Sequence, residues 1–134
     1  MGLDMFLDGI YYLPAQYDED FNVIRKRIKI CVLEIDWRKS NQIHKWFVDN
    51  VQYGNDDCNR YEVSKEQLQE LQNLCKKVLN NHELAKELLP TQSGFFFGPT
   101  KYDEFYFKDL EYTVNEIDKL LKLDYHWYEY FSSW

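Results

Sequence analysis

Cysteine, glycine, proline and methionine are scarce in this chain of 134 residues, which contains 3, 5, 3 and 2 of them, respectively. The cysteines, Cys31, Cys58 and Cys75, are odd in number, widely spaced and form no CxxC pair. The three histidines show neither HxxxH nor HExxH spacing. Such a pattern is typical of neither a disulfide framework nor a zinc site. We therefore expect a reduced, cytoplasmic protein with no metal and no cofactor.

Membrane-spanning runs and catalytic motifs are also missing from the sequence. No stretch approaches the ~20 apolar residues that a membrane span needs, and no signal peptide precedes the first expected strand. Neither phosphate-loop pattern, GxxxxGK[ST] or GxGxxG, occurs, and there is no nucleophile elbow. The candidate proton-transfer groups are His44, His126, Asp56 and Asp57, but no pattern places a nucleophile, a base and an orienting group together. We favour binding over catalysis and expect no contact with membranes.

Aromatic residues are abundant, with 11 Tyr, 9 Phe and 4 Trp. A stable core needs far fewer, and Tyr and Trp combine an apolar body with a polar tip that suits pocket walls and interfaces. The surplus favours a binding surface. The aromatic tail from Asp124 to Trp134, if exposed, also favours self-association, so we expect a homodimer.

The net charge of −7 is unevenly distributed. Between Arg25 and Lys45 lie seven Lys and Arg residues and two acids, whereas the remainder of the chain has 9 basic and 21 acidic residues. An acidic body argues against direct nucleic-acid binding, which needs a basic face. The basic segment could receive a phosphate or an acidic partner, or it could be a solvated strand edge that Lys protects from aggregation.

The hydrophobic pattern predicts one α+β domain over residues 1–134. Alternation at residues 2–13 and 23–35 predicts an antiparallel hairpin, and the β-prone tail at 124–131 predicts a third strand. Ser64 and Gln67 form a capping box that should begin a helix. We expect about three antiparallel strands, covered on one face by three main helices at 37–52, from Ser64 to about 80 and from Thr100 or Asp103 to about Lys122, with a short helix at 83–89.

The stretch from Trp37 to Val48 contains the first set of candidate binding residues. As a helix it places Trp37, Asn41 and His44 on one stripe, with Arg38 at the edge of that stripe, and the neighbouring Lys39 is a further candidate. Arginine offers a planar fork of donors to an anion, and asparagine and histidine can complete the hydrogen bonding. The alternative is a core helix whose polar side chains only bond the neighbouring backbone.

The loop from Thr91 to Thr100 contains the second set. Three consecutive phenylalanines cannot all face one core from one strand, and the flanking glycines allow a close approach or a sharp turn. One interpretation is an aromatic loop that lines a ligand site, and the other is a loop that plugs the sheet against its helices. The candidate ligand-binding residues here are Thr91, Gly94, Phe95, Phe96 and Gly98.

Three blocks of the sequence resemble a family of small phage and prophage proteins. They are Met1–Leu7 (MGLDMFL), Trp37–Val48 (WRKSNQIHKWFV), and Leu88–Thr91 with Gly94–Gly98 (GFFFG). The resemblance implies a virus-encoded accessory protein in a bacterial cytoplasm. It implies no particular activity or catalytic residue.

Three classes of function follow from these observations. The first is stoichiometric sequestration of a nucleotide-like anionic small molecule in a counter-defence role, with aromatic walls for a base and Arg38, Lys39 or His44 for its phosphate. The second is an acidic inhibitor that binds a host defence protein. The third is a small hydrolase-type enzyme.

Overall fold

The computed structural model describes residues 2–94 and 97–134 and has the α+β fold that the sequence predicts. Its main sheet has four antiparallel strands in the order β4-β1-β6-β5, one more than the three expected. A second sheet pairs two short strands, β2 and β3. The strands are β1 (Asp4–Leu13), β2 (Gln16–Tyr17), β3 (Val23–Arg25), β4 (Ile28–Arg38), β5 (Tyr61–Val63) and β6 (Trp127–Ser133).

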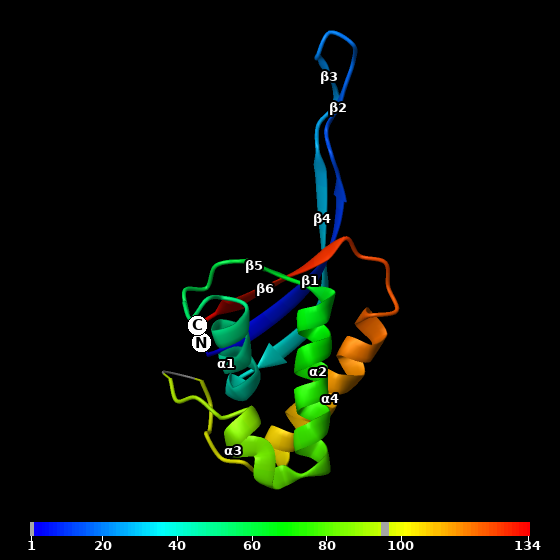
Figure 1. Ribbon diagram of the computed structural model, residues 1–134. Coiled ribbons are helices and arrows are strands. Elements are labelled where there is room, and N and C mark those ends of the chain that lie inside the picture. The colour runs from blue at the N-terminus through cyan, green and yellow to red at the C-terminus, as the bar shows by residue number, and fades with distance from the viewer. Residues whose placement is uncertain (1, 95–96) are drawn as a thin grey trace.

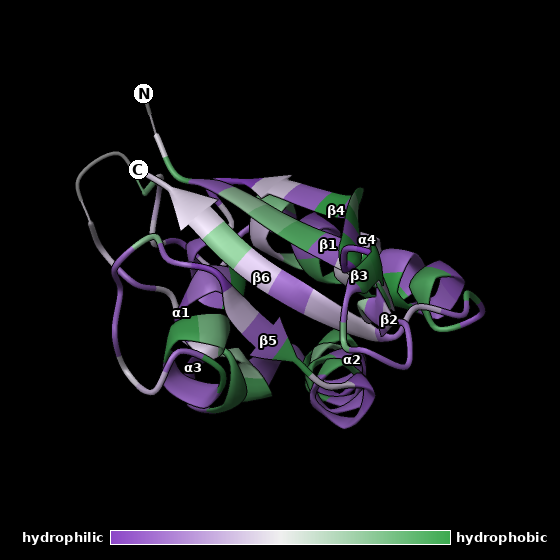
Figure 2. Ribbon diagram, turned by 90° about the horizontal axis from the view of Figure 1, so that it is seen from above, coloured by the Kyte–Doolittle hydropathy of each residue, from purple (hydrophilic) through white to green (hydrophobic). Residues whose placement is uncertain are grey.

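The helices lie on one side of the main sheet, as Figure 1 shows. Figure 2 looks onto the opposite side, where no helix covers the strands. Three long helices were expected and are present, together with a short helix that follows a 3-10 turn at His82–Leu84. They are α1 (Asn41–Asn50), α2 (Lys65–Asn80), α3 (Ala85–Leu88) and α4 (Glu104–Leu120).

The strand alternation in β1 explains how the sheet buries one face. Leu3, Met5 and Leu7 are fully buried in the core, whereas Phe6 between them is only half-buried. The predicted hairpin is confirmed, since β1 pairs antiparallel with β4 from Asp4 opposite Arg38 to the far end of both strands. One sheet face is therefore built from apolar side chains and the other from mixed aromatic and charged ones.

The aromatic tail forms β6, which lies inside the sheet between β1 and β5. This confirms the third predicted strand. Tyr128 and Tyr130 are buried, and the Tyr130 ring stacks on Phe47 with a centroid separation of 3.8 Å. The tyrosines of the tail are thus part of the core, whereas Trp134 at its end is exposed, so most of the aromatic surface on which the dimer was expected to rest is buried.

The helix predicted from residue 37 begins at Asn41 instead. Trp37 and Arg38 complete β4, where Trp37 pairs with Met5. The Trp37 indole is buried and its Nε1–H donates to Thr113 Oγ1 at 2.9 Å. Lys39 then adopts a left-handed backbone with φ 58°, which turns the chain into α1. The prediction was wrong because Trp37 fits two patterns, the helical spacing with Asn41 and the strand alternation with Ile35. Pairing of β4 with β1 selects the strand.

Two other helix starts agree with the sequence. Ser64 and Gln67 form both hydrogen bonds of the capping box that begins α2. Asp103 is the N-cap of α4, with its Oδ1 accepting from the N–H groups of Phe105 and Tyr106. Both caps satisfy backbone donors that the first turn leaves unpaired.

The far ends of β1 and β4, together with β2 and β3, form an arm that projects from the body in Figure 1. This arm, residues 11–33, carries nine exposed large hydrophobic side chains. Tyr11 still contacts Tyr125 and His126 at the base of the arm, but a hairpin that extends beyond the helices (Figure 1) has little to cover the others. The nine side chains are those of Tyr11, Leu13, Tyr17, Phe21, Val23, Ile24, Ile28, Ile30 and Leu33.

Among the described residues, no helix is long and apolar enough to cross a membrane.

Candidate functional site

A cavity of about 260 Å³ lies where the end of β4 meets the segment that leads into α4. Three cationic side chains line it: Arg38, Lys39 and Lys101. We call it the cationic cavity. The other lining residues are Gln42, Thr91, Pro99, Asp103, Phe105, Tyr106 and Asp109.

The cations of this cavity are not committed to strong ion pairs. The Arg38 side chain is 70% exposed, and its Nε lies 3.9 Å from Asp4 Oδ1, at the outer limit of an ion pair. A surface pair of this kind contributes little free energy and gives way easily to another anion. Within the described chain, Lys39 and Lys101 form no ion pair. All three cations are therefore available to a ligand.

Two carboxyl groups, those of Asp103 and Asp109, also line the cavity, and they repel an anion less strongly than two free carboxylates would. Asp103 already accepts two backbone N–H bonds of 3.2 Å at the start of α4. Burial raises the pKa of Asp109, so this carboxyl is more easily protonated when negative charge approaches.

Lys39 and Gln42 flank the start of α1, and Phe105 lies in the first turn of α4. The positive ends of both helix dipoles therefore add to the three cations.

Asn41 is not among the residues that line the cavity, and its side chain holds residues 92, 97 and 99 in place. Its Nδ2 donates to the carbonyl oxygens of Phe97 at 3.1 Å and Pro99 at 3.0 Å. Its Oδ1 accepts from the Gln92 N–H at 2.9 Å. The side chain is buried, and all of its partners are backbone groups. Asn41 therefore positions the cavity wall and is not placed to contact a ligand.

The glycines of this segment serve close packing. Gly98 has φ 88°, and a Cβ built there would lie 3.0 Å from the Lys39 Cβ. A Cβ at Gly94 would overlap the ring of Phe97 at 2.6 Å. Gly98 thus lets the loop lie directly against a cavity cation. Phe95 and Phe96, also named as candidates from the sequence, lie outside the described residues.

His44 belongs to a hydrogen-bond network that joins α1 to β6. Its Nδ1 accepts from the Tyr130 hydroxyl at 2.6 Å, and its Nε2–H donates to Asp56 Oδ1 at 2.9 Å. Trp134 Nε1 donates to the same Asp56 oxygen at 3.0 Å. Burial lowers the pKa of His44, against the opposing effect of Asp56, and burial raises the pKa of Tyr130. The imidazole is thus neutral, with both ring nitrogens occupied.

The other proton-transfer candidates also have structural partners. Asp57 accepts from the Tyr61 hydroxyl at 2.6 Å and from the Asn59 N–H at 3.1 Å, which closes a turn. His126 Nδ1 accepts from the Tyr12 N–H at 2.7 Å. The geometry gives each group a role in the fold and does not assemble them with a nucleophile.

A charged network that the sequence did not indicate lies on the uncovered face of the sheet. Asp8 and Glu129 are directly opposite in β1 and β6, and both are buried. The Arg60 guanidinium bonds both carboxylates, with Nε 2.9 Å from Glu129 Oε1, and lies 4.3 Å from the centroid of the Phe131 ring. Lys29 Nζ lies 2.9 Å from Glu129 Oε2. Because its cations are already paired, we assign this network to sheet stability.

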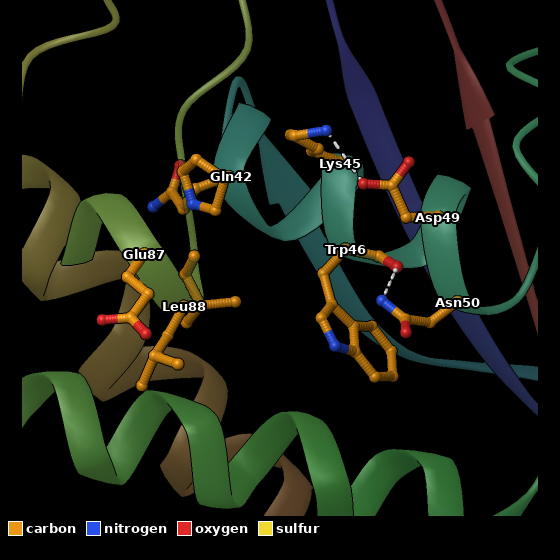
Figure 3. Close-up of a pocket in the computed structure, with 9 residues that line it drawn as sticks. Gln42, Lys45, Trp46, Asp49, Asn50, Glu87 and Leu88 are labelled. Carbon is orange, nitrogen blue, oxygen red and sulfur yellow. Dashed lines mark hydrogen bonds and ion pairs between the residues drawn. The ribbon is translucent and has the colours of Figure 1, made fainter. Parts of the chain in front are cut away.

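A second cavity of about 260 Å³ lies between α1 and α3 and is drawn in Figure 3. Lys45, in its lining, is paired with Asp49 at 2.9 Å, and the Asn50 amide donates to the Trp46 carbonyl at 2.9 Å. Both interactions appear as dashed lines in Figure 3. The cation of this cavity is thus neutralised by its own helix, which makes the site less suited to an anion than the cationic cavity.

Three of the ten residues predicted from the sequence meet at the cationic cavity: Arg38, Lys39 and Thr91. Gly98 packs against one of them, whereas Trp37, Asn41 and His44 are buried in the fold around it. Sequence reasoning missed Lys101 and Phe105. The sequence does show a lysine just before the start of a helix and an aromatic residue in the first turn of that helix. Only the tertiary fold, however, brings these two residues close to Arg38.

No protein-family model, curated protein or solved structure matches this chain.

Proposed function

We propose that the protein binds a nucleotide-like anionic small molecule, one per chain, in the cationic cavity. The observation that carries the proposal is the convergence of Arg38, Lys39 and Lys101 on one cavity without strong internal partners. Arginine can engage a phosphate through two parallel N–H donors, and lysine adds compact positive charge. A phosphate group satisfies all three without burying an unpaired cation.

The size and walls of the cavity favour a mononucleotide over a larger ligand. Its volume of about 260 Å³ lies just below the ~300–1,000 Å³ of typical small-molecule sites, so part of the ligand remains in solvent. Phe105 is 64% exposed and lines the same cavity. Stacking of a base on such a ring is worth about 1–3 kcal/mol in single-stranded nucleic-acid sites. Phosphate on the cations and base against Phe105 is the arrangement we infer.

The setting we propose is counter-defence. A small accessory protein of the phage type, which the sequence resembles, would act by keeping a nucleotide-like signal away from its host receptor. Such sequestration needs binding without turnover. The structural roles of His44, Asp57 and His126 are compatible with this interpretation, since each already has a hydrogen-bond partner within the chain.

A thermal-shift panel tests this proposal. Nucleoside monophosphates should raise the melting temperature of the purified protein, inorganic phosphate should raise it less, and the matching nucleosides should have the smallest effect. Binding at a hundredfold excess over the dissociation constant stabilises the native state by about 2.7 kcal/mol. A panel in which no phosphate-bearing compound shifts the melting temperature would contradict the proposal.

The second candidate, an inhibitor of a host defence protein, draws on the tip of the arm. The side chain of Phe21 is 85% exposed, that of Ile24 62% and that of Val23 55%. Exposed apolar patches of this kind commonly mark sites of protein–protein interaction. Phe21→Ser combined with Ile24→Ser would abolish this function and leave nucleotide binding intact. Arg38→Ala would have the opposite effects, so the two variants distinguish the candidates.

A further inference from the structure

The outer edge of β4 is unpaired within the described chain, because β4 ends the order β4-β1-β6-β5. At the body end, the Tyr112 hydroxyl donates to the Asp36 carbonyl at 2.9 Å and covers the edge there. The open stretch is therefore Ile28–Glu34, where β4 runs out along the arm in Figure 1. Ile28, Ile30 and Leu33 are exposed on it. A long, apolar strand edge is a template for a further strand.

The charges along this edge are arranged in a self-complementary order. Residues 25–29 read Arg-Lys-Arg-Ile-Lys, residues 30–33 are Ile-Cys-Val-Leu, and the acids Glu34 and Asp36 follow. When two copies of this segment lie antiparallel, the basic end of each faces the acidic end of the other. Parallel, in-register pairing would instead set the basic ends against each other. Opposite charges directly across two strands are stabilising and like charges are destabilising.

We propose that two copies of this chain pair antiparallel along β4, joining their sheets about a two-fold axis near Cys31. A two-fold axis perpendicular to the joined sheet leaves a given residue on the same sheet face in both copies. In antiparallel strands, two residues that lie directly opposite each other also point to the same face. The axis must therefore pass through a pair of identical residues. Cys31 is the midpoint of the open stretch Ile28–Glu34.

This register makes three residue-level assignments. Because Glu34 is the extra residue of a bulge in β4, Ile28 of one copy faces Glu34 of the other, and the Arg27 side chain lies opposite that of Asp36 at the end of the open stretch, twice in each dimer. Cys31 faces Cys31, and directly opposed Cα atoms in antiparallel strands are about 4.5–5.5 Å apart. That separation lies within the ~4.4–6.8 Å that a disulfide spans. Cys31 is exposed and unpaired in the single chain, so it reports the contact directly.

The proposal is independent of the nucleotide site, whose lining residues do not include Ile28–Glu34. A second copy is favoured over an unrelated partner because both halves of the charge pattern lie on the same strand. Pairing would also cover the exposed Ile28, Ile30 and Leu33.

A charge-swap series measured by sedimentation velocity tests the pairing. Wild-type protein should dimerise reversibly, and Arg27→Glu or Asp36→Lys should each raise the dimer dissociation constant roughly tenfold or more, because two charge pairs become repulsive. The double variant Arg27→Glu/Asp36→Lys should restore dimerisation. Lys65→Glu and Glu70→Lys make the same charge changes on α2 and should have no effect. A monomeric wild type, or a double variant that dimerises no better than the single variants, would overturn the proposal.

Oxidative cross-linking gives the register. Mild oxidation of wild-type protein and of Cys58→Ser should produce a disulfide dimer on a non-reducing gel, whereas Cys31→Ser should remain uncross-linked. Cys75 is buried and should not contribute. The Arg27→Glu substitution should slow the cross-linking. A dimer that cross-links equally well in Cys31→Ser, or at a rate unaffected by Arg27→Glu, would rule out this interface.

Discussion

Replacing Asn41 with alanine should loosen the wall of the cationic cavity without removing any of its cations. The Asn41 amide makes three hydrogen bonds of 2.9–3.1 Å to backbone groups of Gln92, Phe97 and Pro99. A neutral hydrogen bond contributes about 1 kcal/mol net, and a buried group left without a partner costs more. We therefore expect Asn41→Ala to lower the free energy of unfolding by about 3 kcal/mol, a large part of the ~5–15 kcal/mol of a typical domain.

Urea unfolding measures this loss, since a lower midpoint at an unchanged slope reports stability alone. Hydrogen exchange at the Gln92 amide should accelerate in the same variant. Asn50→Ala is the matched control: among the described residues the Asn50 amide bonds only the Trp46 carbonyl in its own helix, and its loss should cost under about 1 kcal/mol. If Asn41→Ala proved as mild as Asn50→Ala, packing around Phe97 would hold the segment, and the positioning role of Asn41 would be refuted.

Two further predictions concern stability away from the cavity. Burial alone would raise the pKa of Glu129, but hydrogen bonds from Lys29, Trp127 and Arg60 hold it at about 2, below its usual 4.5. Because a lowered carboxyl pKa stabilises the fold above the unfolded value, this contribution should be complete above pH 4.5 and lost as the pH falls towards 2. The contribution is about 2 kcal/mol after screening of the half-exposed partners, and acid titration of Arg60→Ala should show a smaller loss over that range. Ser64→Ala should remove the capping box of α2 and cost about 1 kcal/mol, measurable as a lower urea midpoint, whereas the exposed Lys65→Ala should leave it nearly unchanged.

The elements with a strong local period were predictable from the sequence. Met5 and Leu7 mark the buried face of β1, the capping box begins α2, and Asp103 begins α4. β5 was missed because three residues carry no period of their own, and β6 was found but could not be placed in the centre of the sheet. Strand order depends on pairing between distant segments, which local patterns do not contain.

The candidate site was predictable only in part, for the same physical reason. Arg38 and Lys39 were found because their residue types suit an anion wherever the backbone places them. The helical stripe that grouped Trp37, Asn41 and His44 was wrong at its start, and those three side chains satisfy buried partners instead. Lys101 is distant in sequence and reaches the cavity only through the path of the chain between α3 and α4.

The most direct test of the central claim is isothermal titration of a nucleoside monophosphate into wild-type protein and single variants. A charged hydrogen bond is worth about 1.5–3 kcal/mol, and 1.4 kcal/mol corresponds to a tenfold change in affinity. Arg38→Ala and Lys101→Ala should therefore each weaken binding roughly 10- to 100-fold. Both should keep the wild-type melting temperature, and Lys122→Ala, an exposed charge outside the cavity, should bind as wild type does. Equal affinity in wild type and Arg38→Ala, or no binding of any phosphate-bearing ligand, would contradict the account.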